Sequence, residues 1–244
     1  MTTPAAEPPV LVAASHGTAS PTGQAAVAAL VDAVAARRPD LDVRAAFVDV
    51  QQPDPPAVLA SLPAGRRARL VPLLLSAGYH VFVDLTEAAA AVPGAGVAPA
   101  LGPDVRLAAL LARRLDAAGL RDDDVVVLGA AGSSEVSAVR DCEAVAAQLS
   151  QSIGHEVSVG YLSAAEPRLA DAVAAQRVPG RRVVVATYLL APGFFADLAG
   201  RSGADVVTPP LLLADEAPAT DLVDIVIERY EAAARDTRTT DPRH

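Results

Sequence analysis

In the first half of this 244-residue chain, three side chains of metal-binding type each lie at or shortly after the end of an apolar run. His16 directly follows an apolar run at residues 9–14, and Asp49 closes the apolar stretch at residues 41–48. His80 comes five residues after a third apolar run, where a helical pattern begins. Two imidazoles and a carboxylate suit a first-row divalent ion such as iron, cobalt, nickel or zinc. These residue types therefore predict a transition-metal site.

Simpler roles are open to the same side chains. A histidine after a strand can cap a helix, and an aspartate that closes a strand is often a turn residue. The chain has four histidines, however, and two of them occupy equivalent strand ends, which favours a shared function. His155 precedes a predicted strand and His244 is the last residue, so neither is a candidate ligand.

The elements that must position these side chains alternate between strand and helix. Short apolar runs predict strands, and apolar residues three or four positions apart predict helices between them. This alternation is typical of a parallel, doubly wound α/β sheet, in which ligands bind at the carboxyl ends of the strands. All three side chains are therefore expected at one edge of a sheet. The predicted strands lie at residues 9–14, 41–48, 69–75, 125–129, 155–161 and 182–190, and the predicted helices at residues 23–38, 55–62, 79–91, 105–118, 135–150, 166–176, from 193 onward and 214–234.

The second half of the chain repeats the first at a shift of 114 or 115 positions. Internal repetition of this kind indicates a duplicated fold. We expect two similar α/β halves, residues 1–120 and residues 121–244, which meet in the polar run from Gly119 to Asp124. The matched pairs include Gly17 with Gly132, Pro53 with Pro167, Gly65-Arg66-Arg67 with Gly180-Arg181-Arg182, and residues 74–78 with residues 189–193.

The candidate ligands are missing from the second copy. Because the same fold is expected in both halves, these side chains are not needed to build it. The second half is therefore interpreted as a degenerate copy, and the site is expected in the first half. The equivalent positions hold Ala131 for His16, Ser163 for Asp49 and Phe195 for His80.

The loop after the first strand also has the composition of an anion-binding loop. Ser15, Gly17 and Thr18 flank the first histidine, and Ser133 and Ser134 follow the equivalent glycine of the second half. Strand-to-helix loops of this kind direct backbone N–H groups at a ligand. The alternative is that the hydroxyl groups only cap the helices that follow.

Bulk composition and missing motifs exclude other classes of function. A formal net charge of −9 and an aromatic content of 3% argue against binding to nucleic acid or anionic membranes. Dinucleotide-binding, Walker A, Cys-x-x-Cys and nucleophile-elbow motifs do not occur in the sequence. The single cysteine, Cys142, fits a reducing cytoplasm. The N-terminal apolar run is too short for a signal peptide or a membrane span.

These motifs together resemble the class II chelatases, which include the sirohydrochlorin cobaltochelatases and ferrochelatases. The resemblance is carried by Ser15-His16-Gly17, by the strand end at residues 47–49, and by residues 72–80 with Asp84. It spans roughly residues 9–210. It implies a chelatase-like fold of two α/β halves in a fused form, with the second half closing a tetrapyrrole cleft.

The resemblance also assigns roles to individual residues. His16 and His80 match the two metal-binding histidines of the family and serve as catalytic residues. Asp49 stands where the family usually has a glutamate, which is one methylene longer. Thr18 and Ala19 replace the usual serine and basic residue. The substrate-binding residues implied are Ser15, Gly17, Thr18, Gly78, Ser133 and Ser134.

The implied reaction is insertion of Fe²⁺ or Co²⁺, with Ni²⁺ as a further possibility, into sirohydrochlorin for siroheme or cobalamin biosynthesis. The metal is a substrate, no organic cofactor is expected, and the chain is expected to be a cytoplasmic monomer or homodimer. Sirohydrochlorin is a polycarboxylate, whereas this protein is acidic. Helix N-termini, with Arg44 and Arg66 as weaker candidates, are therefore expected to bind its carboxylates.

Two other functions fit part of the pattern. A metal-trafficking or tetrapyrrole-binding protein without turnover would use the same cleft. A histidine phosphatase also has a His-Gly pair after its first strand, but it needs an arginine just before the histidine to hold phosphate. Here that position is Ser15. Metal-dependent turnover of sirohydrochlorin separates the enzyme from the binding protein.

Overall fold

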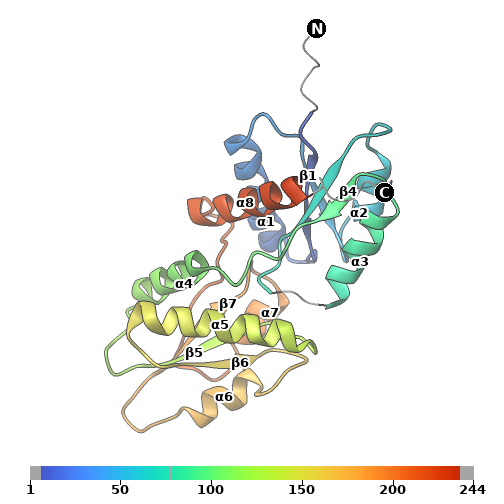
Figure 1. The fold of residues 1–244 in the computed structure, drawn as a ribbon. Helices are drawn as coiled ribbons and strands as arrows, with labels where there is room; N and C mark the ends of the chain where they lie inside the picture. Colours follow the sequence, from blue (N-terminus) through green and yellow to red (C-terminus); the bar gives the residue numbers. More distant parts are fainter. Residues whose placement is uncertain (1–6, 77–78, 237–244) are drawn as a thin grey trace.

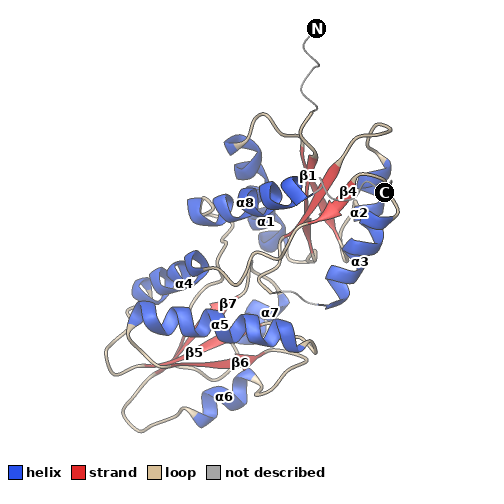
Figure 2. Ribbon diagram, viewed as in Figure 1, coloured by secondary structure: helices blue, strands red, loops and turns tan. Residues whose placement is uncertain are grey.

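Each half of the chain forms a four-stranded parallel sheet flanked by helices (Figures 1 and 2). The computed structural model describes the backbone of residues 7–76 and 79–236, and the side chains in this range other than those of residues 79–82 and 236. The strand orders are β2-β1-β3-β4 and β6-β5-β7-β8. This architecture confirms the predicted fold class.

The elements of the first half are β1 (Val10–Ser15), α1 (Pro21–Arg37), β2 (Val43–Phe47), α2 (Pro55–Ala60), β3 (Ala68–Pro72), α3 (Tyr79–Ala90), β4 (Ala95–Val97) and α4 (Val105–Ala117). Those of the second half are β5 (Val125–Ala130), α5 (Val136–Ile153), β6 (Val157–Tyr161), α6 (Leu169–Ala175), β7 (Val183–Tyr188), α7 (Phe194–Ala199), β8 (Val206–Val207) and α8 (Thr220–Asp236). The two sets follow one another in the same order.

The duplication extends to the register of the strands. Val10 pairs with Ala68 in the first sheet, and Val125 pairs with Val183 in the second. Each residue of the second pair lies 115 positions after its counterpart. The helices α1, α3 and α4 begin 115 positions before α5, α7 and α8. The halves thus share backbone geometry as well as element order.

The last helix of each half packs on the other half. The helix α4 contacts α5 and β7 of the second half, whereas α8 contacts α1 and β3 of the first (Figure 1). The two helices also contact each other. The division of the chain into residues 1–120 and 121–244 stays a prediction, and across it the halves exchange one helix each.

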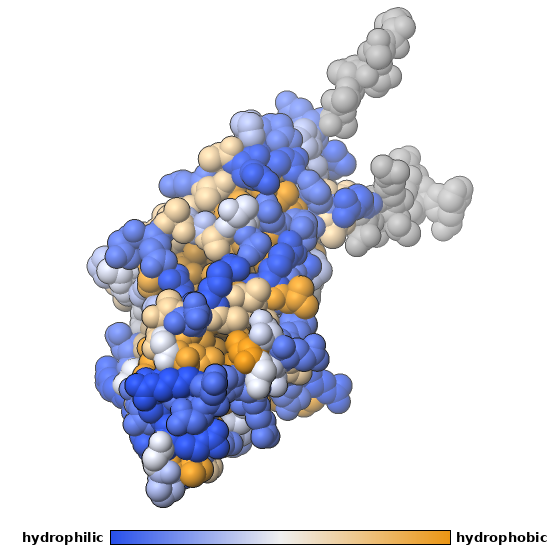
Figure 3. Space-filling view, turned by 90° about the vertical axis from the view of Figure 1, so that its left-hand side faces the viewer, coloured by the Kyte–Doolittle hydropathy of each residue, from blue (hydrophilic) through white to orange (hydrophobic). Residues whose placement is uncertain are grey.

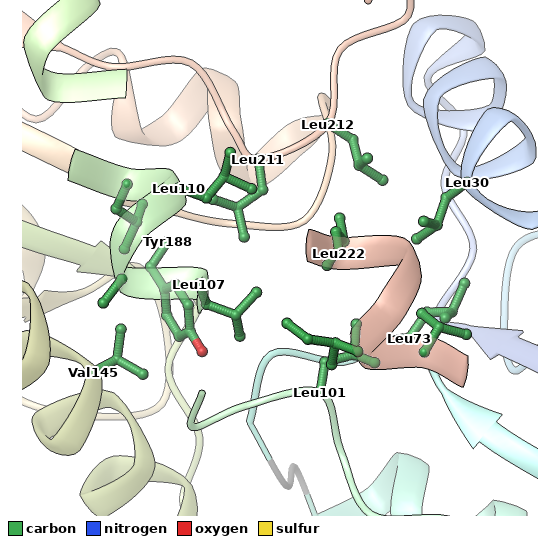
Figure 4. Close-up of a cluster of buried hydrophobic side chains, with 14 of the residues drawn as sticks. Leu30, Leu73, Leu101, Leu107, Leu110, Val145, Tyr188, Leu211, Leu212 and Leu222 are labelled. Carbon is green, nitrogen blue, oxygen red and sulfur yellow. The ribbon is translucent and has the colours of Figure 1, made fainter. Parts of the chain in front are cut away.

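One hydrophobic core runs through both halves. It includes Leu30 of α1, Leu73 after β3, Leu107 of α4 and Tyr188 of β7. Figure 4 shows Leu107 and other leucine side chains between Tyr188 and Leu73. Separating the halves would expose this apolar surface, so the core holds the two sheets together. On the face shown in Figure 3, apolar surface gathers around the middle of the molecule, while hydrophilic residues cover most of the rest.

Local sequence accounts for several helix boundaries. The Ser20 hydroxyl caps α1 by accepting from the Gly23 backbone N–H, and Pro21 occupies the first helical position. Asp54 and Asp104 cap α2 and α4 in the same way. The prediction that the final helix begins at residue 214 is wrong, because it begins at Thr220, two residues after a proline.

The sequence analysis also missed the outer strands of both sheets. β4 has three residues and β8 has two, which is too short for a recognisable apolar run. Within the described residues, we find no helix both long and apolar enough to span a membrane.

Candidate functional site

The loops that follow β1 and β2 lie against each other at the carboxyl edge of the first sheet. The backbone N–H of Val48 donates to the Ser15 carbonyl, and that of Asp49 donates to the His16 carbonyl, both at 2.9 Å. Parallel pairing between the two strands thus continues past their ends. It brings the backbones of His16 and Asp49 together, as the sequence predicted.

This crossing of the two loops requires glycine at position 17. Gly17 has φ +91°, and a Cβ there would collide with the Asp49 carbonyl oxygen. Gly132 in the second half has φ +90°, and a Cβ there would collide with the Ser163 carbonyl oxygen. Only glycine adopts this conformation without strain and leaves room for the facing carbonyl. Both copies therefore need the glycine, whatever the neighbouring side chains do.

Side chains at the two aspartate-equivalent positions behave differently. Asp49 is exposed, and its Oδ1 accepts a hydrogen bond from the Val50 backbone N–H at 2.7 Å. Ser163 instead donates its hydroxyl to the Ala131 carbonyl at 3.0 Å. The serine therefore closes its loop internally, whereas the Asp49 carboxylate stands at the surface beside the His16 backbone. A carboxylate in that place can contribute charge or a ligand to a metal ion held by His16.

The two predicted histidine ligands differ in what the structure describes. His16 is exposed directly after β1. His80 is the second residue of α3, and its side chain lies outside the described residues, as does Gly78. Among the residues whose side chains are described, no three histidine, cysteine, aspartate or glutamate residues form a metal-binding group. Joint ligation by His16, His80 and Asp49 stays a prediction.

The predicted anion-binding loop is held by side chains of the neighbouring elements. The Thr18 backbone N–H donates to the Gln51 side-chain oxygen at 3.0 Å, and the Thr18 carbonyl accepts from Gln24 at 2.8 Å. In the second half, the Ser133 hydroxyl accepts from the Glu135 backbone N–H. Ser15 is buried as the last residue of β1. These contacts fix the loop beside His16, and substrate binding by its residues stays a prediction, as it does for Ser134.

The carboxyl edges of the two sheets face each other. The Tyr188 hydroxyl, at the end of β7, donates to the Leu75 carbonyl just after β3, at 2.8 Å. A Cβ on Gly23 of α1 would collide with the Pro192 carbonyl oxygen, which shows how closely the loop after β7 approaches α1. The loop that carries His16 therefore lies at the border between the halves, where a ligand would contact both.

Cys142 of α5 also lies at this border, close to Ser76. Burial raises the pKa of the Cys142 thiol to about 11. Without a bound metal ion, the side chain is therefore a neutral thiol near pH 7.

The expectation that Arg44 and Arg66 bind substrate carboxylates is wrong. Arg44 is the second residue of β2 and pairs with Asp42 at 2.9 Å. Arg66 precedes β3 and pairs with Glu7 at 3.3 Å. Both lie toward the amino ends of the strands, so the length of the sheet separates them from the carboxyl edge.

Sequence analysis missed Arg140, which lies early in α5 and is exposed. The helix α5 begins at the carboxyl edge of the second sheet. Arg140 is therefore better placed than Arg44 or Arg66 to contact a carboxylate at that edge. No ion pair of Arg140 is present among the described residues. Its position within the helix, rather than any motif, is the signal that could have identified it.

Two surface hollows lie away from these loops. One of about 420 Å³ lies between α2 and α3, with Asp84 in its wall. The other, of about 270 Å³, lies beside Asp122 and His155 of the second half. Neither includes His16 or Asp49 in its lining.

Comparison with known proteins places the chain in context. The CbiX family model matches residues 10–118 and 125–198. SirB from Bacillus subtilis with Fe³⁺ superposes with a TM-score of 0.77 at 18% identity, over 96% of this chain and 98% of SirB. The sirohydrochlorin chelatase SirB from Bacillus subtilis subspecies spizizenii in complex with cobalt gives 0.74 at 17% identity, over 96% and 98%. CbiX, described as the terminal enzyme for biosynthesis of siroheme in denitrifying bacteria, gives 0.66 at 21% identity, over 92% and 99%. Comparison with curated proteins gave no match.

Proposed function

Because the chain belongs to the CbiX family, we propose that it is a chelatase that inserts Fe²⁺ or Co²⁺ into sirohydrochlorin, with both the metal ion and the macrocycle as substrates. The observation that carries the proposal is the asymmetry of the duplicated fold. The same strand end holds exposed His16 in one copy and Ala131 in the other. A histidine that the fold does not need, at the edge where α/β sheets bind ligands, indicates a functional ligand.

The chemistry requires an exchange of two pyrrole protons for one divalent ion. The metal must be held loosely enough to be transferred, so a site with few protein ligands suits it better than a closed tetrahedral site. His16 is exposed at the carboxyl edge and meets this requirement. We assign His16 and His80 to metal binding; once the metal ion is transferred, one imidazole accepts a pyrrole proton, and the second proton passes to solvent.

Asp49 supplies negative charge beside the metal in this proposal. Its backbone N–H donates to the His16 carbonyl, so the two residues lie side by side. The carboxylate already accepts one hydrogen bond from Val50, and it contributes through its charge or a single oxygen. The loop residues Ser15, Gly17 and Thr18, with Gly78, Ser133 and Ser134, are assigned to the macrocycle carboxylates.

The decisive experiment is an anaerobic absorbance assay of sirohydrochlorin with Fe²⁺, Co²⁺ and Ni²⁺ in turn. The intact protein is expected to accelerate insertion of iron or cobalt well above the rate of the free ions. His16→Ala is the test variant, and His155→Ala is the matched control from the second half. Tight binding of macrocycle and metal without any acceleration would instead identify a carrier protein.

A further inference from the structure

Two adjacent phenylalanines are exposed at the start of α7. Phe194 is 72% exposed and Phe195 is 38% exposed. Their ring centroids are 5.7 Å apart, and the rings meet edge to face at 62°. The chain has four phenylalanines and no tryptophan, so two of its few large aromatic rings are placed together in solvent. Large apolar side chains that gather at a surface typically mark a binding site.

This aromatic pair adjoins the loop that carries His16. Gly193 directly precedes Phe194, and the position of a Cβ on Gly193 is 3.1 Å from the Thr18 hydroxyl oxygen and 3.9 Å from the Ser20 Cβ. The preceding carbonyl, that of Pro192, touches α1 at Gly23. Figure 1 shows α7 near the junction of the two lobes. The backbone segment that carries the two rings therefore contacts the His16 loop at Thr18, two residues after His16.

The aromatic pair occupies positions equivalent to the start of α3 in the first half. Tyr79 begins α3 and Phe194 begins α7, 115 positions later, so Phe195 occupies the position of His80. A phenyl ring cannot bind a divalent transition metal, but it can pack against a flat conjugated ring. The position that carries a predicted metal ligand in the first half thus carries an apolar surface in the second.

We propose that Phe194 and Phe195 form a platform for one face of the macrocycle, one ring lying flat against it and the other meeting it with its edge, while the metal ion approaches the other face from the His16 side. The inference rests on the proposed chelatase function and deepens it. A metal ion enters a tetrapyrrole along the normal to its plane, so one face must stay open toward His16. An aromatic platform holds the other face without competing for the metal, and it leaves the carboxylates at the ring edge free to contact the loops after β1 and β5.

Separate binding measurements on Phe194→Ala, Phe195→Ala and the double variant test this platform. Metal-free sirohydrochlorin is titrated by absorbance, and Co²⁺ alone is titrated by calorimetry. Each lost ring is expected to weaken macrocycle binding by about fivefold, and the double variant by about 20-fold, while Co²⁺ affinity stays unchanged. Val178→Ala, which shortens a side chain 47% exposed after α6, is the control for lost apolar surface and should leave both affinities unchanged.

Phe194→Leu and Phe195→Leu separate aromatic packing from general apolarity, and we expect them to retain part of the affinity. Wild-type macrocycle affinity in the double alanine variant would overturn the platform while leaving the chelatase proposal standing. Loss of Co²⁺ binding with unchanged macrocycle binding would also overturn it. If the wild-type protein is a dimer and the double alanine variant is a monomer with unchanged macrocycle affinity, the aromatic pair is instead a contact between two copies of the chain. Failure of the intact protein to bind sirohydrochlorin would remove the chelatase proposal itself, and the platform with it.

Discussion

At the end of β1 the chain places His16, and at the end of β5 it places Ala131, on backbones of the same shape. In both halves a glycine with positive φ lies under the carbonyl of the neighbouring loop. In both halves the neighbouring strand ends two positions before this carbonyl. Its last residue, Phe47 or Tyr161, pairs with the last residue of the central strand. The glycine is therefore a requirement of the fold, whereas the histidine before it is a choice of function. Comparison of two copies within one chain separates these two kinds of constraint.

The largest effect is expected from removing the histidine that distinguishes the halves. His16→Ala should lower the rate of metal insertion about 100-fold or more, because it removes a metal ligand and a proton acceptor. The unfolding midpoint should stay close to that of the intact protein, because Ala131 occupies the same place in the second half. Turnover assays and thermal unfolding of the purified variant check both statements. Near-normal turnover would contradict the proposed site.

The glycines should show the opposite pattern, in which the halves respond alike. Gly17→Ala and Gly132→Ala should each lower the free energy of unfolding by about 3 kcal/mol, because both introduce strain and a backbone collision. Gly65→Ala, with φ +78° and no atom within 4 Å of the new Cβ, is the control and should cost about 1 kcal/mol. Urea unfolding measures all three variants. Equal costs for all three would show that the loop crossing is not tightly constrained.

Gly17→Ala should in addition reduce metal insertion beyond its effect on stability, since it displaces the His16 loop. Gly132→Ala should reduce insertion less in the folded fraction, because the loop that it displaces carries Ser133 and Ser134 but no predicted metal ligand. Turnover corrected for the folded fraction separates these cases. A larger activity loss from Gly132 than from Gly17 would contradict the assignment of the metal site to the first half.

A smaller effect is expected at the contact between the halves. Tyr188→Phe removes the hydroxyl that donates to the Leu75 carbonyl, and it should lower the free energy of unfolding by about 1–2 kcal/mol. Tyr230→Phe, which removes a buried bond from α8 to the Pro9 carbonyl on the side of the first sheet, away from the facing carboxyl edges, is a matched comparison. If Tyr188→Phe also weakens macrocycle binding and Tyr230→Phe does not, the contact helps to position the two halves around the ligand.

The smallest expected effect is on pH dependence and again contrasts the halves. Both ring nitrogens of His155 face carbonyl oxygens, those of Ile153 at 2.9 Å and Arg121 at 3.0 Å, and only the imidazolium can donate to both. These backbone hydrogen bonds, first that to Ile153, raise the pKa of His155. Because the folded pKa is higher, the stabilisation is fully present below the unfolded value of about 6.5. It is lost as pH rises through the folded pKa.

His155→Ala should therefore lower stability at pH 5.5 more than at pH 8.5, by less than about 1 kcal/mol because solvent screens the side chain. Metal insertion should show the reverse trend and fall in acid, because a protonated imidazole offers no lone pair to a metal ion. Urea unfolding and Co²⁺ turnover across the same pH series test the two trends. A His155→Ala effect that grows with pH would contradict the double hydrogen bond.

Much of this fold follows from local pattern. Apolar runs located six of the strands, and the shift of 114 or 115 positions revealed the duplication because both copies keep the same glycines and strand ends. The same reasoning placed His16 and Asp49 at one sheet edge, since parallel strands share the direction in which they end. These features depend on residues close together in sequence or on a repeat of nearly constant spacing, so the amino-acid sequence alone determines them.

Only the tertiary structure decided which surfaces meet. The apolar stripe of α4 or α8 is satisfied by any apolar sheet face, so the sequence does not reveal that each helix packs on the opposite half. Likewise, the contact of Gly193 with Thr18 joins residues far apart in the chain and depends on the angle between the two sheets. That angle is set by how the shared core packs, and it brings Gly193, which directly precedes Phe194, beside the His16 loop.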